Sequence, residues 1–205
     1  METKDKYLSI AAPAEGVFKD RGSRFTAFAC PVETEEEIKL HIASLKKEFH
    51  DARHHCYAWR LGVDGEPWRA SDDGEPAGTA GRQILSQIDS AGLSDVLVVV
   101  VRYFGGVKLG VPGLIAAYRG STAEALAAAE KIEKTAVKHF RLSFPYDAMP
   151  AVMKLLKSMD LKQAAPEFGE SCSIDAAVRL GAVETFIDAV SKISGCVCEN
   201  KSISL

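Results

Sequence analysis

The sequence lacks a long apolar run, a secretion signal and a regular cysteine pattern. Its longest unbroken apolar run, Val96 to Val101, is far shorter than the roughly 20 residues that span a bilayer. The amino terminus, METKDKYLSI, has no apolar core of the kind found in signal peptides. The five cysteines form an odd set without a disulfide framework. We therefore expect a cytoplasmic protein with reduced thiols and no role in a membrane.

The sequence also lacks a large excess of positive or negative charge. The chain has 25 basic and 28 acidic residues, for a formal net charge of −3. This balance excludes wholesale attraction to nucleic acid, so any contact with a polyanion must be local. At 205 residues and 47% apolar composition, the chain can bury one large core or two smaller ones. Two domains are the expected arrangement.

The first two-thirds of the chain predicts strands that alternate with helices. Thr34 followed by Glu37 is a capping box, so a helix is expected from there to near Phe49. The run 95–103 is apolar at each position from 96 to 101, which is typical of a central strand covered on both faces. The other expected elements are a strand at 22–32, a strand from His54 that turns at Asp64 and Gly65 into 66–70, a helix from about Thr79, and a long alanine-rich helix at 112–131.

A change in element order marks a second domain. The charged segment EKIEKT at 130–135 reads as a hinge, which divides the chain into domains 1–134 and 135–205. Beyond it, strand, helix, two strands, helix and strand are expected in turn, at 137–144, 147–159, 162–168, 171–180, 182–194 and 196–204. This βαββαβ order predicts a ferredoxin-like domain. The fold class is therefore α/β (α+β) with two domains.

Three stretches near expected strand ends are rich in polar residues and glycine: ARHHCYAWR, SDDGEPAGTAGR and RYFGGVKLGVPGL. In the third, a buried strand leads into a glycine-rich turn and a helix start, which offers backbone N–H groups to an anion. Its spacing is not that of a P-loop, and the glycines also suit a simple tight turn. The candidate anion or nucleic-acid ligands are Arg53, Arg102, Gly105, Gly106, Lys108 and Gly110.

The other two stretches contain a possible polar cluster. Asp72, Asp73 and Glu75 could bind a hard cation, but a turn that caps the next helix explains the same residues and is the favoured interpretation. His54, His55 and Cys56 suggest a thiol with an adjacent base, yet neighbouring strand residues point to opposite faces, so only His54 can share a face with Cys56. A buried cysteine is the more common outcome. No metal or cofactor is assigned.

The motifs HHCYAWR, SDDGEPAGTAG and RYFGGVKLG, with the earlier GSRF, together resemble the signature of the IMPACT/YigZ family over roughly residues 16–130. The resemblance implies an N-terminal ribosomal-protein-S-five domain-two-like fold, which also occurs in domain IV of elongation factor G. It implies a C-terminal ferredoxin-like domain similar to domains III and V of that factor. Eukaryotic relatives of the N-terminal domain are translation regulators, so the resemblance also implies a link to translation.

Three functions are compatible with these observations. The leading hypothesis is a translation-associated binding or regulatory protein that contacts RNA or the ribosome through its N-terminal domain. The alternative is a small hydrolase or metal-dependent enzyme, which would use the cluster of His54, Asp72, Asp73 and Glu75. A protein-interaction regulator with aromatic anchors is the third, its anchors being Trp68, Tyr103 and Phe104. Convergence of His54, Arg102 and the acidic loop in one concave pocket would favour the enzyme, and basic residues along an open face would favour RNA.

Overall fold

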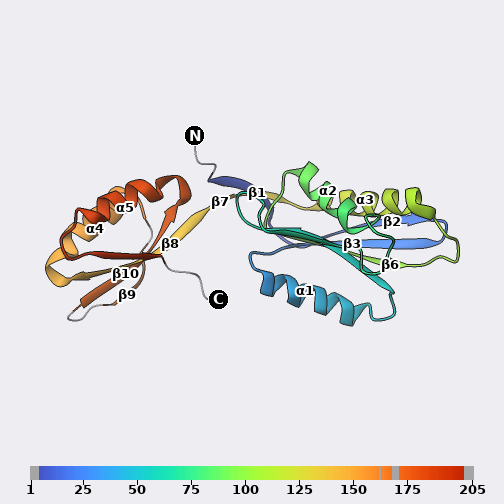
Figure 1. The fold of residues 1–205 in the computed structure, drawn as a ribbon, viewed down its shortest axis with the longest axis horizontal. Helices are drawn as coiled ribbons and strands as arrows, with labels where there is room; N and C mark the ends of the chain where they lie inside the picture. The colour runs from blue at the N-terminus through green and yellow to red at the C-terminus, as the bar shows by residue number, and fades with distance from the viewer. Residues whose placement is uncertain (1–4, 162, 168–170, 201–205) are drawn as a thin grey trace. The chain divides into compact units, whose positions relative to one another are not determined.

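The computed structural model describes residues 5–161, 163–167 and 171–200, and the chain forms two compact units (Figure 1). The larger unit is Tyr7–Lys134, and the smaller combines Met1–Lys6 with Thr135–Leu205. Each unit has a hydrophobic core of its own. That 1–134 and 135–205 fold independently of each other stays a prediction.

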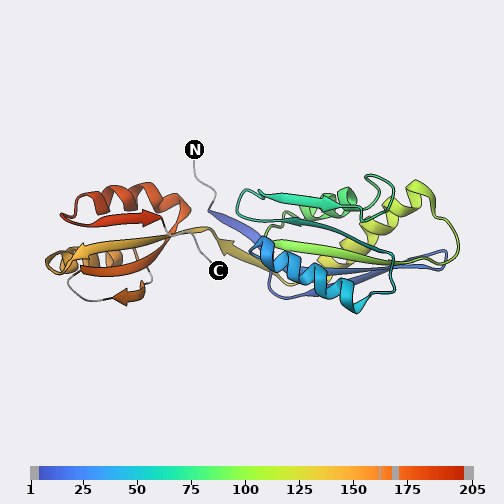
Figure 2. The same cartoon turned by 60° about the horizontal axis from the view of Figure 1, so that its bottom comes forward.

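The larger unit is built on a five-stranded antiparallel sheet. Its strands, in spatial order, are β2 (Ala14–Asp20), β3 (Ser23–Pro31), β6 (Val96–Tyr103), β4 (His54–Arg60) and β5 (Trp68–Ser71). The apolar run thus forms the middle strand, as its composition predicts. Helix α1 (Glu35–Glu48) lies on one face of this sheet, and α2 (Gly81–Ala91) and α3 (Gly110–Ala128) lie on the other (Figure 1, Figure 2).

Strand β6 is apolar at successive positions because both of its faces are covered. Val96, Val98 and Val100 belong to the core beneath α2 and α3. Leu97 and Val99 belong to the separate core beneath α1. Side chains alternate along a strand, so one continuous apolar run supplies both cores.

The capping box at the start of α1 is present. The Glu37 N–H donates to the Thr34 hydroxyl at 3.2 Å, and the Glu37 carboxylate accepts from the N–H of Glu33 at 2.7 Å. The helix ends at Phe49, whose N–H donates to the Leu45 carbonyl. Sequence therefore predicted both ends of this helix correctly, because capping is a local interaction.

Two strands at the ends of the larger unit were not expected. Strand β1 (Lys6–Ile10) pairs with β7 (Lys131–Thr135), so the segment predicted as a hinge is a strand. Lys134 of β7 lies 3.3 Å from the buried Asp95 carboxylate, which also accepts from the Tyr7 hydroxyl at 2.5 Å. Strands β1 and β7 form a separate two-stranded sheet, and both contact the distant Asp95. Sequence pattern alone does not reveal such contacts.

The smaller unit has the predicted βαββαβ order. Its elements are β8 (Val137–Pro145), α4 (Met149–Ser158), β9 (Gln163–Glu167), β10 (Ser171–Arg179), α5 (Val183–Ser191) and β11 (Val197–Asn200). The sheet order β11-β8-β10-β9 with antiparallel pairing is that of a ferredoxin-like fold. Residues 162, 168 and 201–204 of the expected strands lie outside the described residues. Among the described helices, none is both long and apolar enough to cross a membrane.

Candidate functional site

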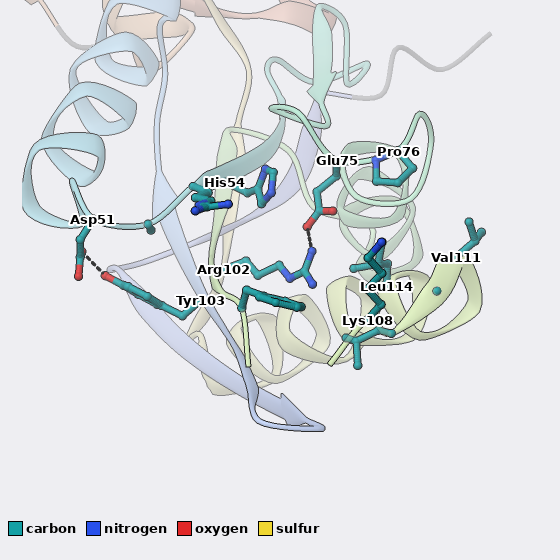
Figure 3. A pocket seen from close by; sticks show the side chains of 14 residues that line it. Asp51, His54, Glu75, Pro76, Arg102, Tyr103, Lys108, Val111 and Leu114 are labelled. Atoms are coloured by element: carbon teal, nitrogen blue, oxygen red, sulfur yellow. Dashed lines mark hydrogen bonds and ion pairs between the residues drawn. The ribbon is translucent and has the colours of Figure 1, made fainter. Parts of the chain in front are cut away.

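A pocket of about 830 Å³ lies in the larger unit where β4, β6, the loop before α2 and the start of α3 meet (Figure 3). It is lined by Asp51, Ala52, Arg53, His54, Glu75, Pro76, Arg102, Tyr103, Phe104, Lys108, Leu109, Gly110, Val111 and Leu114. The antiparallel register of β4 and β6 places His54 directly opposite Arg102. The sheet therefore brings together residues from two of the three polar stretches, and the loop after β5 supplies the third.

Arg102 is the charged centre of this pocket. Its side chain is only 9% exposed, and its Nη1 lies 2.5 Å from Oε1 of Glu75. The guanidinium carbon lies 5.3 Å from the ring centre of Phe25 and 5.7 Å from that of Phe104. The Arg102 Nε has no hydrogen-bond partner within the described part of the chain. Nη1 of the guanidinium is thus paired with Glu75, while the side of the guanidinium that is turned away from Glu75 faces the pocket (Figure 3).

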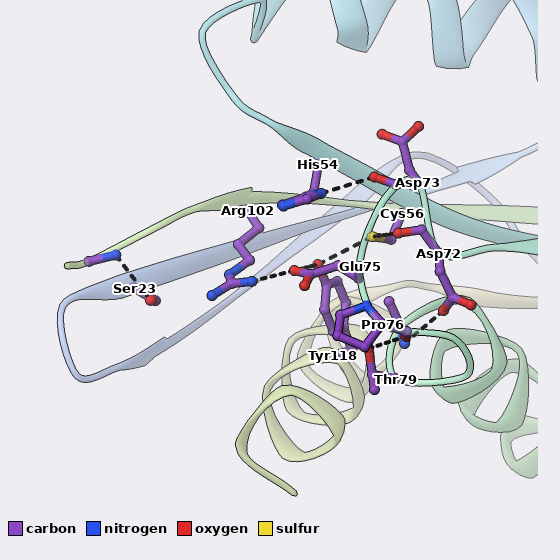
Figure 4. Close-up of polar contacts among 12 residues, drawn as sticks. Ser23, His54, Cys56, Asp72, Asp73, Glu75, Pro76, Thr79, Arg102 and Tyr118 are labelled. Atoms are coloured by element: carbon purple, nitrogen blue, oxygen red, sulfur yellow. Dashed lines mark hydrogen bonds and ion pairs between the residues drawn. The ribbon is translucent and has the colours of Figure 1, made fainter. Parts of the chain in front are cut away.

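A buried polar chain holds the glutamate that pairs with Arg102 (Figure 4). The Tyr118 hydroxyl donates to Glu75 Oε1 at 2.8 Å. The Cys56 sulfur lies 3.2 Å from that hydroxyl and 3.0 Å from the carbonyl oxygen of Asp72. Burial raises the pKa of Tyr118 far above its ordinary value, so this phenol stays a hydrogen-bond donor. This buried hydrogen-bond network fixes Glu75, and Glu75 in turn orients the Arg102 side chain.

Cys56 does not fit the role of a thiol nucleophile. Its side chain is fully buried, and burial raises the pKa of Cys56 to about 12. A nucleophile must be the thiolate, which this thiol does not form near neutral pH. His55 points away from Cys56, as alternation along the strand predicts, and pairs instead with Asp73.

The two aspartates of the acidic stretch have structural contacts outside the pocket. The Asp72 carboxylate accepts from the backbone N–H groups of Gly78, Ala80 and Gly81, at 2.8, 3.0 and 2.8 Å, and so caps α2. Asp73 accepts from the N–H of His55 at 2.7 Å. No three His, Cys, Asp or Glu side chains of the described ranges gather closely enough to hold a metal ion. The residues proposed from sequence as one polar cluster therefore do not form a single site.

The glycine-rich turn is mainly structural. The Gly105 N–H donates to the Ser23 hydroxyl at 3.1 Å, and a Cβ at this position would lie 1.9 Å from the backbone of Gly22. Gly106 adopts φ +87°, which favours glycine. Neither residue lines the pocket, in contrast to Gly110. The expected cradle of glycine N–H groups is thus reduced to the start of α3, because the rest of the turn packs against the β2–β3 hairpin.

The start of α3 opens into the pocket. Its N-cap, Leu109, makes no side-chain capping hydrogen bond, and the first turn carries no acidic residue. Such a helix start has a partial positive charge and free N–H donors, although Pro112 lacks one. Lys108 precedes this helix start in the chain, and Arg53 also lines the pocket. Neither basic side chain has an ion-pair partner within the residues that the structure describes.

The remaining rim residues are constrained by hydrogen bonds. The Tyr103 hydroxyl donates to the Asp51 carboxylate at 2.6 Å, and this bond lowers the pKa of Asp51. The Nδ1 of His54 lies 2.9 Å from the carbonyl oxygen of Asp73. Phe104 stands exposed at the rim, whereas Trp68 lies away from the pocket. The aromatic anchors proposed from sequence therefore do not form one site.

Sequence reasoning missed Tyr118. It stands in an alanine-rich helix and carries none of the features that marked the three polar stretches. A spacing signal was available, because Gly110, Leu114 and Tyr118 follow one another at intervals of four and so share one face of α3. The first two line the pocket, and the third lies beneath it.

These features define a class: a two-unit α+β protein whose larger unit carries, at the end of an antiparallel sheet, a pocket lined by both basic and acidic side chains. A family model for the Impact N-terminal domain matches residues 21–126. The Escherichia coli IMPACT family member YigZ is 38% identical over 160 residues, which cover 77% of this chain and 78% of that protein. A Thermus thermophilus IMPACT family member is 43% identical over 140 residues, with coverage of 68% and 75%. The chain belongs to the IMPACT family.

A solved structure agrees with this assignment. A crystal structure of a hypothetical protein is 31% identical, with a TM-score of 0.74 and coverage of 98% of this chain and 100% of its own. A structure described as the two-domain translational regulator Yih1 is 30% identical and covers 60% of this chain and 47% of its own, with a TM-score of 0.36. Mouse protein IMPACT is 35% identical over 115 residues, which are 53% of this chain and 36% of that protein.

Proposed function

We propose that this chain is a translation-associated binding protein whose larger unit contacts RNA or the ribosome through the pocket around Arg102. The observation that carries the proposal is a buried arginine facing the pocket together with two basic side chains at its rim, Arg53 and Lys108, which have no ion-pair partner among the described residues. Family membership supports the link to translation, since Yih1, which is 30% identical to this chain, is a translational regulator.

The arrangement suits a phosphate group. A guanidinium offers several N–H donors in a plane that matches phosphate oxygens, and a flanking lysine adds a mobile charge. The uncapped start of α3 contributes backbone donors and a partial positive charge on the same side. Because Glu75 neutralises part of the charge of Arg102, the net attraction also needs Arg53 and Lys108.

The number of basic residues limits the salt dependence of binding. The whole chain carries a net charge of −3, so long-range attraction to a polyanion is absent and only these local contacts contribute. Each neutralised phosphate adds about 0.7 to 0.9 to the slope of log affinity against log salt. Three basic residues therefore predict a slope of roughly −2 to −3, which is shallow for a nucleic-acid-binding protein.

The test is sedimentation with ribosomes, or filter binding to ribosomal RNA, across a salt series. The parent protein is compared with Lys108→Glu and with the matched control Lys47→Glu, which makes the same charge change on the exposed side of α1. We expect Lys108→Glu to weaken binding to all RNA sequences and to make the slope of log affinity against log salt shallower. Lys47→Glu should behave as the parent does. Absence of binding at low salt, or equal binding by the parent and Lys108→Glu, would refute the proposal.

One observation favours a hydrolase as the second candidate. His54, Arg102 and Glu75 do converge in one concave pocket, and the Nδ1 contact with a carbonyl leaves Nε2 of His54 as a possible base. In that case Arg102 would stabilise an anionic substrate. Incubation of RNA and simple phosphate esters with the parent and with His54→Gln separates the two functions. Turnover that is lost in His54→Gln would identify an enzyme, and intact substrate with retained binding would identify a binding protein.

A further inference from the structure

The shape of the pocket restricts which part of an RNA can enter it. We infer that it takes a single nucleotide unit of a single strand, with the phosphate at Arg102 and the base against Phe104. This inference rests on the proposed function and specifies the ligand of the same site. A volume of about 830 Å³ lies within the range of roughly 300 to 1,000 Å³ typical of small-ligand pockets.

The phosphate position follows from the burial of Arg102. Its side chain is 9% exposed, so a ligand group reaches it only by entering the pocket. Its Nε is buried without a partner in the described ranges, and Nη1 is held by Glu75. An anion at this point would lie between Arg102, Lys108 and the uncapped start of α3, each of which favours negative charge.

A duplex does not fit this geometry. In a double helix the bases are stacked inside and the phosphates follow a regular outer surface, which can touch the rim but cannot enter a pocket. A single strand can turn one nucleotide out of line, because its bases are not paired. Rim contacts with Arg53 would then hold the neighbouring phosphate. The buried position of Arg102 therefore selects single-stranded RNA over duplex RNA.

Phe104 supplies the surface for the base. Its side chain is 57% exposed, although it is large and apolar. The Arg102 guanidinium lies over its ring at 5.7 Å, and Phe25 packs on the same guanidinium from within the core. Aromatic rings that stack with bases are the usual way in which proteins hold single strands without reading their sequence. Leu109, Val111 and Leu114 form an apolar wall of the same pocket.

Four probes test the inference at one ionic strength: inorganic phosphate, adenosine monophosphate, a single-stranded oligoadenylate and its duplex with the complementary strand. We expect the mononucleotide to bind more tightly than phosphate, and the single strand more tightly than the duplex. Phe104→Ala should weaken mononucleotide and single-strand binding by about 5- to 150-fold, since base stacking on an aromatic ring has that value, and should weaken phosphate binding far less. Phe104→Tyr should retain the parent affinity.

Val107→Ala is the matched control, because Val107 is 50% exposed in the same turn and does not line the pocket. Equal binding of phosphate and mononucleotide, or of single strand and duplex, would overturn the inference. The RNA proposal would still stand in that case if Lys108→Glu weakened binding. Mononucleotide binding without any single-strand binding would also overturn it, and would identify a free nucleotide as the ligand. If neither the single-stranded oligoadenylate nor its duplex binds, the proposed function itself is refuted.

Discussion

Arg102 and Glu75 form a buried ion pair, in which Nη1 of the arginine lies 2.5 Å from Oε1 of the glutamate. The two side chains are 9% and 3% exposed, so both charges have lost most of their hydration. A pair of this kind adds little net stability, because desolvation offsets the attraction between the charges. Its effect here is positional: it ties the loop before α2 to the end of β6 and fixes the orientation of the guanidinium in the pocket.

Breaking this pair should be costly. Glu75→Gln leaves a buried guanidinium without its counter-charge, and we expect the free energy of unfolding to fall by about 3 kcal/mol. Urea denaturation followed by circular dichroism measures the change. The double variant Glu75→Leu with Arg102→Met removes both charges, and it should recover most of the lost stability while abolishing RNA binding. A Glu75→Gln protein as stable as the parent would show that the pair does not neutralise a buried charge.

Gly105 should tolerate no side chain, for a reason unrelated to ligand binding. In Gly105→Ala the new Cβ would lie 1.9 Å from a backbone carbon of Gly22. The β2–β3 hairpin must then shift, and we expect a loss of about 3 kcal/mol. Gly106→Ala meets no atom within 4 Å, and its cost is limited to the left-handed backbone, about 1 to 2 kcal/mol. Thermal unfolding of the two variants compares them, and equal melting temperatures would contradict the close packing of this turn.

His55 should make stability depend on pH. Burial lowers the pKa of His55 below its ordinary value of 6.5, against an opposing contribution from Asp73. The unfolded chain therefore binds a proton at a higher pH than the folded chain does. As the pH falls below about 6.5, protonation favours the unfolded state, and the free energy of unfolding should decrease until the pH passes the lowered folded pKa.

Urea midpoints measured from pH 8 to pH 5 test this dependence. In His55→Gln the decrease below pH 6.5 should be smaller than in the parent. His41→Gln, which removes a histidine from the α1 helix, is the matched control and should retain the parent slope. The same slope in His55→Gln as in the parent would mean that other groups cause the loss of stability in acid.

Sequence by itself was sufficient where the determining interactions are local. The apolar run at 96–101 predicted a strand covered on both faces, and β6 is the central strand. The box formed by Thr34 and Glu37 predicted the start of α1. In the smaller unit, the alternation of short periodic segments predicted the ferredoxin-like order. Each of these features depends on residues a few positions apart, so the chain carries the information directly.

Only the tertiary structure decided which charged residues meet. Glu75 and Asp72 stand in the same short stretch, yet Glu75 turns into the pocket toward Arg102 while Asp72 turns away to cap α2. The pocket also needs Tyr118, which is 43 residues from Glu75 in sequence. Such contacts arise from the register of β4 against β6 and from the packing of α3 on the sheet. These long-range arrangements follow from burial of the whole core, which no local pattern encodes.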